Sequence, residues 1–309
     1  MKRIRLSVPL LVLAVLLSLS AAPILGQTRI EETRKLDPGG RFVLDSDAGS
    51  VTVTGGPEAG ARIVIASKHD DLKATMDIAI EESPGLVTLT ARRKKGEASS
   101  FLGWLFGEDG GQSVRFEITV PTKTAVEVKT GGGQIAVSAL EGETRLETAG
   151  GSIEAASVKG NLTASTSGGH VKVRKIDGRA KVQTSGGSIQ ADGVGGDLEA
   201  ATSGGSIRVT GAAGAVRART AGGSVEVSFL PGNSHGGEIS SMGGGILVAL
   251  DPAANLVVEA STMGGSVATD LPFVKSSQES RSKLVGTLGA GGQALNVSTM
   301  GGSIRLEKL

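Results

Sequence analysis

The chain has 309 residues, including 48 Gly, 6 Phe and 1 Trp, but no Tyr and no Cys, and its formal net charge is +1. The lack of cysteine excludes disulfide frameworks, zinc knuckles, thiolate catalysis and lipid attachment through an N-terminal cysteine. Small and branched aliphatic residues make up nearly all of the 39% hydrophobic fraction, which predicts a thin core.

The first 26 residues are typical of a secretory signal peptide. Three basic residues precede an apolar run from Leu6 to Leu19, and small residues follow. The run is shorter than the ~20 residues that span a bilayer, so we expect cleavage after Gly26 rather than a retained anchor helix. Loss of the three charges takes the net charge from +1 to −2, which removes the electrostatic basis for binding nucleic acid. The sequence predicts an exported protein that is periplasmic, outer-surface or secreted, with no stable transmembrane span.

Residues 27–125 show alternating strand patterns without a fixed period, and we expect an N-terminal β region that caps the first repeat. Within it, residues 92–112 form a loop insertion that joins a basic run to the apolar residues Phe101, Trp104 and Phe106. These rings could contact lipid headgroups or a partner, or fold back onto the cap. The strands are expected at Arg41–Leu44, Gly49–Val53, Arg62–Ala66, Met76–Ile80, Leu86–Ala91 and Val114–Val120.

Residues 126–228 contain a repeat of 18 residues. Three columns keep this step in one register: the aliphatic residue of a Gly-Gly-x-Ile/Val motif, a threonine and a second glycine. The aliphatic column contains Ile135, Ile153, Val171, Ile189, Ile207 and Val225, and the threonine column Thr130, Thr148, Thr166, Thr184, Thr202 and Thr220. Each unit alternates as two short strands, and its residues recur one full unit later, which favours coil stacked on coil.

The repeat therefore predicts an all-β, single-chain parallel β-solenoid with 18-residue coils, capped by the irregular N-terminal β region. Such a narrow coil explains why rings are absent between Phe116 and Phe229. We expect the Gly-Gly pair of each unit, such as Gly186-Gly187, to form a bend at positive φ. The structural turn ladder predicted on this basis is Gly132, Gly150, Gly168, Gly186, Gly204 and Gly222.

The residues that follow the aliphatic column argue against calcium. Calcium-binding β-rolls need an Asp three residues beyond the second Gly of each nonapeptide. The positions here carry mixed charges that suit a solvated face: Ala136, Glu154, Lys172, Gln190, Arg208 and Glu226.

Residues 229–309 continue as longer, irregular β coils and a C-terminal cap, with aliphatic positions at Ile246, Val267 and Ile304. Met242, Met263 and Met300 form a ladder where earlier coils have Ser or Ala. Such a column could hold copper, a soft metal, but we expect it to fill gaps in the packing where the coils widen.

Three features of the chain resemble a known family. They are the strand Phe116–Val120 leading to the first Gly-Gly turn, the Thr-Ser/Ala-Gly-Gly-Ser/His-Ile/Val repeat, and the closing segments Leu288–Gly292 and Leu295–Ile304. Together they resemble the putative-adhesin family of bacterial envelope proteins, a domain of unknown function, over about residues 38–309. The resemblance implies a β-solenoid and an exported, surface-associated role, and it supplies no catalytic residues.

No motif predicts catalysis, a metal site or a cofactor. His69, His170 and His235 lie in separate segments, and no Gly-x-Ser-x-Gly elbow occurs. We interpret His170 as a surface substitution at a turn and His69-Asp70-Asp71 as a polar loop rather than a metal site. The expected function is that of a non-enzymatic adhesin or envelope scaffold that binds an envelope, polysaccharide or protein surface, in an undetermined oligomeric state. The alternatives are a polysaccharide-acting enzyme on a β-helix and a self-assembling envelope scaffold.

Overall fold

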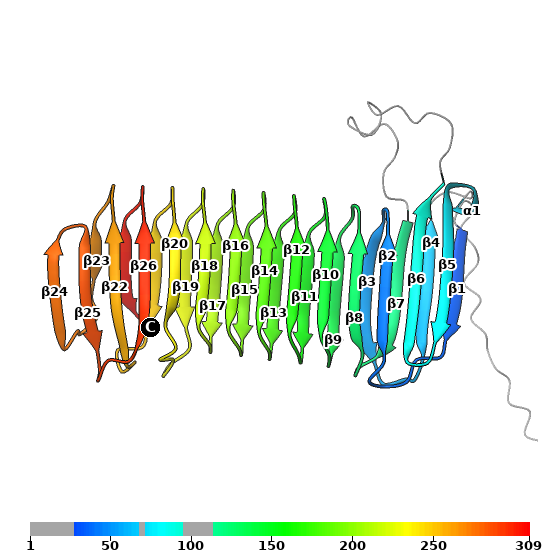
Figure 1. The fold of residues 1–309 in the computed structure, drawn as a ribbon, viewed down its shortest axis with the longest axis horizontal. Helices are drawn as coiled ribbons and strands as arrows, with labels where there is room; N and C mark the ends of the chain where they lie inside the picture. Colours follow the sequence, from blue (N-terminus) through cyan, green and yellow to red (C-terminus); the bar gives the residue numbers. More distant parts are fainter. Residues whose placement is uncertain (1–27, 68–71, 95–113) are drawn as a thin grey trace, which may run out of the picture.

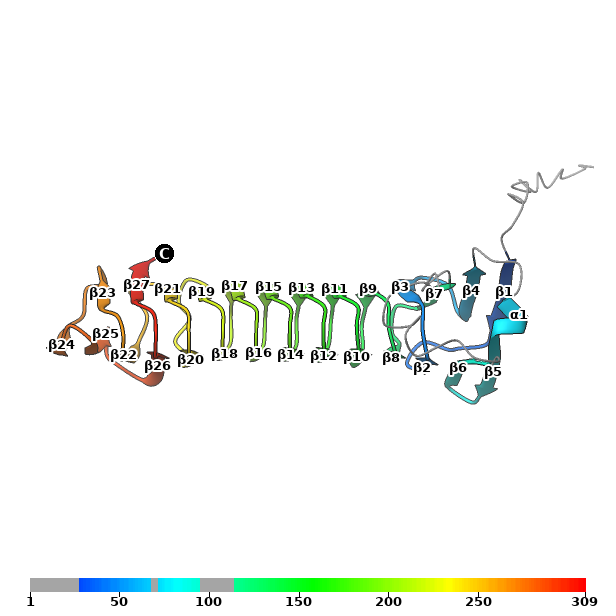
Figure 2. The ribbon, with the colours of Figure 1, turned by 90° about the horizontal axis from the view of Figure 1, so that it is seen from above.

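The computed structural model describes residues 28–67, 72–94 and 114–309 of the chain. This part folds into 27 strands and one short helix, α1 (Leu72–Thr75). The strands form two long sheets that face each other as the two layers of an elongated ribbon (Figures 1 and 2). Within this part of the chain, no helix has the length and the apolar character needed to cross a membrane.

Over most of the chain, successive strands belong alternately to the two sheets. The 13-stranded sheet, sheet A, contains β1 (Thr28–Arg34), β3 (Ser50–Gly56), β4 (Ala61–Ser67), β7 (Val114–Pro121), β9 (Ile135–Leu140), β11 (Ile153–Val158), β13 (Val171–Ile176), β15 (Ile189–Val194), β17 (Ile207–Ala212), β19 (Val225–Phe229), β21 (Ile246–Leu250), β23 (Val267–Thr269) and β27 (Ile304–Lys308). The 14-stranded sheet, sheet B, contains β2 (Arg41–Ser46), β5 (Met76–Ser83), β6 (Leu86–Arg93), β8 (Ala125–Thr130), β10 (Thr144–Thr148), β12 (Leu162–Thr166), β14 (Ala180–Thr184), β16 (Leu198–Thr202), β18 (Val216–Thr220), β20 (Gly237–Ser241), β22 (Leu256–Thr262), β24 (Lys275–Ser280), β25 (Lys283–Leu288) and β26 (Gln293–Thr299).

The predicted solenoid is confirmed. From β8 to β19 each coil contributes one strand to each sheet, and every strand pairs in parallel with the strand one coil away. The register matches the predicted columns, since Ile189 pairs with Val171 and Ile207, and Thr184 pairs with Thr166 and Thr202. All six strands expected between residues 41 and 120 are also present. The sequence does not predict β1, which precedes these strands, or the short helix α1 between β4 and β5.

The core is a single layer of side chains between the two sheets. In the coil of β15 and β16, Ile189, Ala191, Val194, Leu198 and Ala200 are all buried, while Gln190 and Asp192 face solvent. Threonines at the ends of the sheet B strands are the main polar residues in this interior. The space left between facing strands suits aliphatic side chains, in keeping with the composition.

A β-bulge recurs in the sheet A strands and was not predicted. Ala139, Ser157 and Lys175 have φ of 58°, 56° and 54°, and Gly193 and Gly211 occupy the same column with φ of 69° and 68°. The residue at this position is left out of the pairing, so that Val158 pairs with Ile176 directly after Ala156 pairs with Arg174. The bulge lets both Ala155 and Val158 point into the core, three residues apart.

The predicted turn glycines lie at the turns after the sheet B strands, but the expected positive φ is wrong for Gly186 and Gly187, neither of which adopts it. The glycines are explained by the close approach of successive coils. A Cβ on Gly187 would overlap the backbone carbonyl of Gly169, whereas a Cβ on Gly186 would lie 3.4 Å from the Gly168 oxygen, an ordinary contact. The second glycine of each pair, one residue after the predicted ladder, is therefore the position that cannot hold a side chain.

At both ends, coils do not follow the order of the chain. The first coil, β2 and β3, lies between β8–β9 and the later strands β6 and β7. The last coil, β26 and β27, inserts between β20–β21 and β22–β23. At the N-terminal end, antiparallel strands end both sheets, with α1 between the layers (Figure 2). At the other end, the antiparallel β24–β25 hairpin ends sheet B, whereas sheet A ends in the parallel strand β23. These elements lie at the two ends of the stacked coils, where the sequence predicts caps.

The glycine pair gives a direct test of the coil contact. We expect Gly187→Ala to lower the free energy of unfolding by about 3 kcal/mol or more, because the coils must separate to admit the methyl group. Gly186→Ala should change it by less than about 1 kcal/mol. Urea unfolding of both variants measures the difference, and equal effects would contradict the contact as the reason for the glycine.

In the bulge column, replacing a residue by glycine is expected to raise the stability of the protein. Lys175 adopts the left-handed region, which costs a residue with a Cβ about 1–2 kcal/mol. Because Gly193 and Gly211 already stand in this column, Lys175→Gly should fit without rearrangement and raise stability by about 0.5–1 kcal/mol. Lys172→Gly on the same strand, in extended backbone, should lower it by a similar amount. A thermal melt that shows both variants destabilised would refute the strain.

Candidate functional site

A groove runs along the edge of the ribbon where the sheet B strands end, the upper edge in Figure 1. It has a volume of about 810 Å³ and crosses seven coils, in the spatial order given by the strands β12, β14, β16, β18, β20, β26 and β22. Three columns of side chains line it, which we call the floor, the strand rim and the turn rim. The groove follows the solenoid axis, so one residue of each column comes from each coil.

The floor is the threonine column: Thr166, Thr184, Thr202, Thr220, Ser241, Thr299 and Thr262. Each hydroxyl joins two coils. Thr202 Oγ1 donates to the carbonyl oxygen of Gly187 at 2.8 Å and accepts the N–H of Gly205 at 3.3 Å. The same pair of bonds recurs at Thr184 and Thr220. The floor hydroxyls are thus committed to the main chain, and they make the groove a rigid surface.

The strand rim is nearly neutral. It contains Ser165, Gln183, Ala201, Arg219, Ser240, Ser298 and Ser261. Its one charged member, Arg219, forms an ion pair with Glu238 at 2.5 Å. The rim therefore offers hydroxyls and an amide to a ligand, with little net field.

The turn rim changes character along the groove. Ser167, Ser185 and Ser203 occupy it first, then Ala221, and then the methionines in the spatial order Met242, Met300, Met263. The predicted methionine ladder exists, but the expected packing role is wrong, since the three side chains are 57%, 53% and 80% exposed. They stand on a turn whose side chains point away from the coil. The additional residues between β19 and β20, around Pro231–His235, lengthen the coil that carries Met242, and they lie at the opposite edge of the ribbon (Figure 1).

The histidines do not form a site in the described part of the chain. His170 replaces a serine in a column of exposed and half-buried residues. Its Nδ1 accepts the N–H of Ser188 at 2.9 Å, as Ser188 Oγ accepts that of Ser206. His235 is exposed on a loop. His69, Asp70 and Asp71, like Phe101, Trp104 and Phe106, lie outside the described residues. Within residues 28–67, 72–94 and 114–309, no three His, Asp or Glu side chains are grouped to hold a metal.

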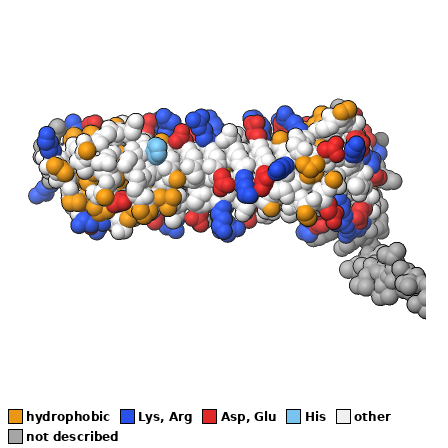
Figure 3. All heavy atoms as spheres, turned by 90° about the horizontal axis from the view of Figure 1, so that it is seen from below, with side chains coloured by type: hydrophobic (Ala, Val, Ile, Leu, Met, Phe, Trp, Pro, Cys, Tyr) orange, Lys and Arg blue, Asp and Glu red, His pale blue; other side chains and the backbone are white. Residues whose placement is uncertain are grey.

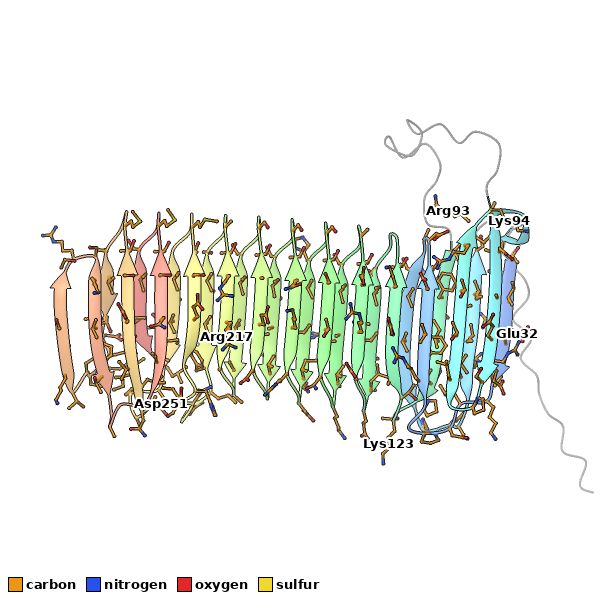
Figure 4. All side chains as sticks on the ribbon, viewed as in Figure 1. Glu32, Arg93, Lys94, Lys123, Arg217 and Asp251 are labelled. Carbon is orange, nitrogen blue, oxygen red and sulfur yellow. The ribbon has the colours of Figure 1, made fainter. Side chains whose placement is uncertain are left out.

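Two aspartates with lowered pKa values, Asp251 and Asp47, bond to the main chain near loops and do not line the groove. Asp251, at the lower edge in Figure 4, accepts N–H bonds from Ala253 and Gly232, both at 2.8 Å, and these lower its pKa. Hydrogen bonding from the Arg93 N–H, aided by Arg92, lowers the pKa of Asp47. Both carboxylates therefore act as anchors for the backbone beside them.

Charges of opposite sign alternate over the outer faces. Arg208 pairs with Glu226 at 2.9 Å and Lys181 with Glu199 at 3.2 Å, each across one coil. Figure 3 shows the same interspersed pattern along the edge opposite the groove. Exposed pairs of this kind add little stability, and their alternation leaves no stripe of one sign.

The sequence matches the model of a known protein family over most of its length. A model described as Toastrack DUF4097 matches residues 41–307. The chain belongs to the DUF4097 family. The Toastrack description suits two facing sheets of stacked coils, and the family is a domain of unknown function. No curated protein matches this sequence.

Solved structures match the chain at low sequence identity and with TM-scores below 0.5. A putative adhesin from Bacteroides fragilis is 13% identical with a TM-score of 0.44, covering 90% of this chain and 97% of its own. A putative lipid binding protein from Parabacteroides distasonis is 12% identical with a TM-score of 0.47, covering 91% and 96%. A putative cell adhesion protein from Clostridium sporogenes is 11% identical with a TM-score of 0.22, covering 91% and 100%.

The floor of the groove gives a testable prediction. Thr202→Val keeps the shape of the side chain but removes the partner of both the Gly187 carbonyl and the Gly205 N–H. We expect a loss of about 1–3 kcal/mol in the free energy of unfolding. Thr202→Ser should cost less than half as much, because Ser241 makes the same two bonds in its coil. Urea unfolding measures both variants, and an unchanged valine variant would show that the hydroxyl is dispensable.

Proposed function

We propose that this protein is an exported, non-enzymatic binding scaffold of the bacterial cell envelope, and that it contacts its partner through the groove. The observation that carries the proposal is the continuous groove of about 810 Å³ across seven coils. Export is supported by the charged and apolar residues of the first 26 positions.

The shape of the groove favours a partner with an extended chain. Seven coils at about 4.8 Å each place the first and last floor residues about 29 Å apart. A groove of this length suits a polysaccharide strand or an extended polypeptide segment lying along the solenoid axis. The repeated hydroxyls of Ser167, Ser185 and Ser203 would offer such a chain one polar contact per coil.

The rigidity of the floor supports binding without rearrangement. Each floor hydroxyl bonds to two backbone groups, so the walls hold their positions before a partner arrives. Preorganisation of this kind lowers the ordering cost of association. A stiff surface is what an adhesin or an envelope scaffold requires.

The chemistry of the lining favours binding over hydrolysis. Glycoside hydrolysis uses two facing carboxyl groups, whereas the groove is lined by hydroxyls, methyl groups, thioethers, one amide and an arginine paired with Glu238. This composition supports a non-enzymatic role and disfavours the polysaccharide-acting alternative.

A change on the turn rim tests the groove. Ser185→Arg and Ser203→Arg place long cations where exposed hydroxyls line the middle of the groove. We expect the double variant to lose at least about tenfold in retention on purified envelope from the producing cells, with little change in melting temperature, because exposed substitutions change stability little. Thr210→Arg, an exposed change on sheet A outside the groove, is the matched control.

The outcomes separate the parts of the proposal. Absence of retention of the unmodified chain on envelope, polysaccharide or protein surfaces would overturn the binding role. Equal retention of the groove variant and the control would move the contact off the groove. Cell fractionation with protease treatment of intact cells tests export, and an unprocessed cytoplasmic chain would contradict it.

A further inference from the structure

We propose that the three methionines of the turn rim form a binding site for one soft monovalent cation, Cu(I), with Ag(I) as its redox-inert equivalent. This inference goes beyond the proposed scaffold role and does not depend on it. It rests on the register, the exposure and the surroundings of Met242, Met300 and Met263.

The register places the three thioethers on adjacent coils. Ser241 pairs with Thr299, and Thr299 pairs with Thr262, and one methionine follows each of these residues. Main-chain bonds extend the alignment into the turn, since the Met300 N–H bonds to the Ser241 carbonyl and the Met263 N–H to that of Thr299, both at 3.2 Å. The methionines therefore stand side by side with Met300 in the middle.

The spacing of the coils suits a soft metal. Neighbouring strands lie about 4.8 Å apart, which is about twice the ~2.3 Å length of a zinc–thiolate bond, a reference length for metal–sulfur bonds. Two sulfurs on adjacent coils can thus hold one ion between them with almost no displacement of the backbone. The third methionine can reach the same ion because its side chain has three rotatable bonds.

The exposure of the side chains leaves the sulfurs available. Met242, Met300 and Met263 are 57%, 53% and 80% exposed, whereas Met76 is 5% exposed and packed in the core. A solvent-facing column of three large apolar residues has no packing explanation in the coil. Earlier coils place Ser or Ala at this position without loss of the fold.

The surroundings select the kind of ion. Around the methionines the other rim and the floor supply only hydroxyls, from Ser240, Ser298, Ser261, Ser241 and the threonines. Thioethers prefer Cu(I), while Mg²⁺ and Ca²⁺ require carboxylate or carbonyl oxygens. Three cations lie on neighbouring segments: Arg219, Lys283 and Arg281, whose carbonyl accepts the Val267 N–H. Arg219 and Lys283 pair with Glu238 and Glu259, which reduces their repulsion of a monovalent cation.

Titration of the full chain with Cu(I) under anaerobic, reducing conditions, against a chromogenic Cu(I) chelator, tests the site. We expect one ion per chain. Met300→Leu should weaken binding most, by at least about tenfold, since Met242 and Met263 then stand two coils, about 9.6 Å, apart. Met263→Leu should weaken it less, because Met242 and Met300 remain neighbours.

Met76→Leu is the matched control, since it removes one thioether from the core and leaves the column intact. Labelled methionine methyl groups give a second measurement, in which Ag(I) should shift the signals of the three rim residues and leave that of Met76 in place. Failure of the chain to take Cu(I) from the chelator would overturn the proposal. So would undiminished binding by a variant with all three rim methionines replaced by leucine.

Discussion

At each Gly-Gly turn the main chains of successive coils are in direct contact, and this contact sets the spacing of the coils. The second glycine of each turn, such as Gly187, leaves no room for a Cβ against the carbonyl of Gly169. The threonine three residues earlier bonds across the same turn to the preceding coil. Because these two features fix the approach of the coils, the strands stack in register, and every side-chain column, in the core or on the groove, follows from it.

The repeating part of the fold could be predicted because its information is local. A period of 18 residues in three columns is enough to set the strands, their parallel pairing and the buried aliphatic ladder. The order of the end coils could not be predicted in this way. The turns at Met242, Met263 and Met300 have nearly the same sequence, so each is an acceptable neighbour for the others. The β24–β25 hairpin, which pairs antiparallel with β22, occupies the outer side of that coil and leaves its inner side to β26.

The errors in detail have physical causes. Positive φ is expected at the glycine turns of the repeat, but among them it occurs only at Gly133, in the first turn. It recurs instead in the bulge column, where Ala139, Ser157 and Lys175 give no local signal and Gly193 and Gly211 alone hint at the conformation. The methionine column was found from its spacing, but its exposure was misjudged. Side chains alternate between the two faces of the sheet within a strand. This alternation does not continue into the turn that follows, where side chains point outward. The groove was missed for a related reason, since it lies between a strand end and a turn and no single motif encodes it.

The insertion of the last coil links the architecture to the proposed chemistry. Residues 293–308 of β26 and β27 pair with β20–β21 on one side and with β22–β23 on the other. They complete both the groove and the methionine column, since Met300 enters between Met242 and Met263. Without this coil the two flanking coils would have unpaired edges, and the groove would be interrupted between Met242 and Met263. The main-chain pairing that inserts β26 and β27 therefore also completes the surface. A solenoid without this inserted coil would present neither the full-length groove nor three adjacent thioethers.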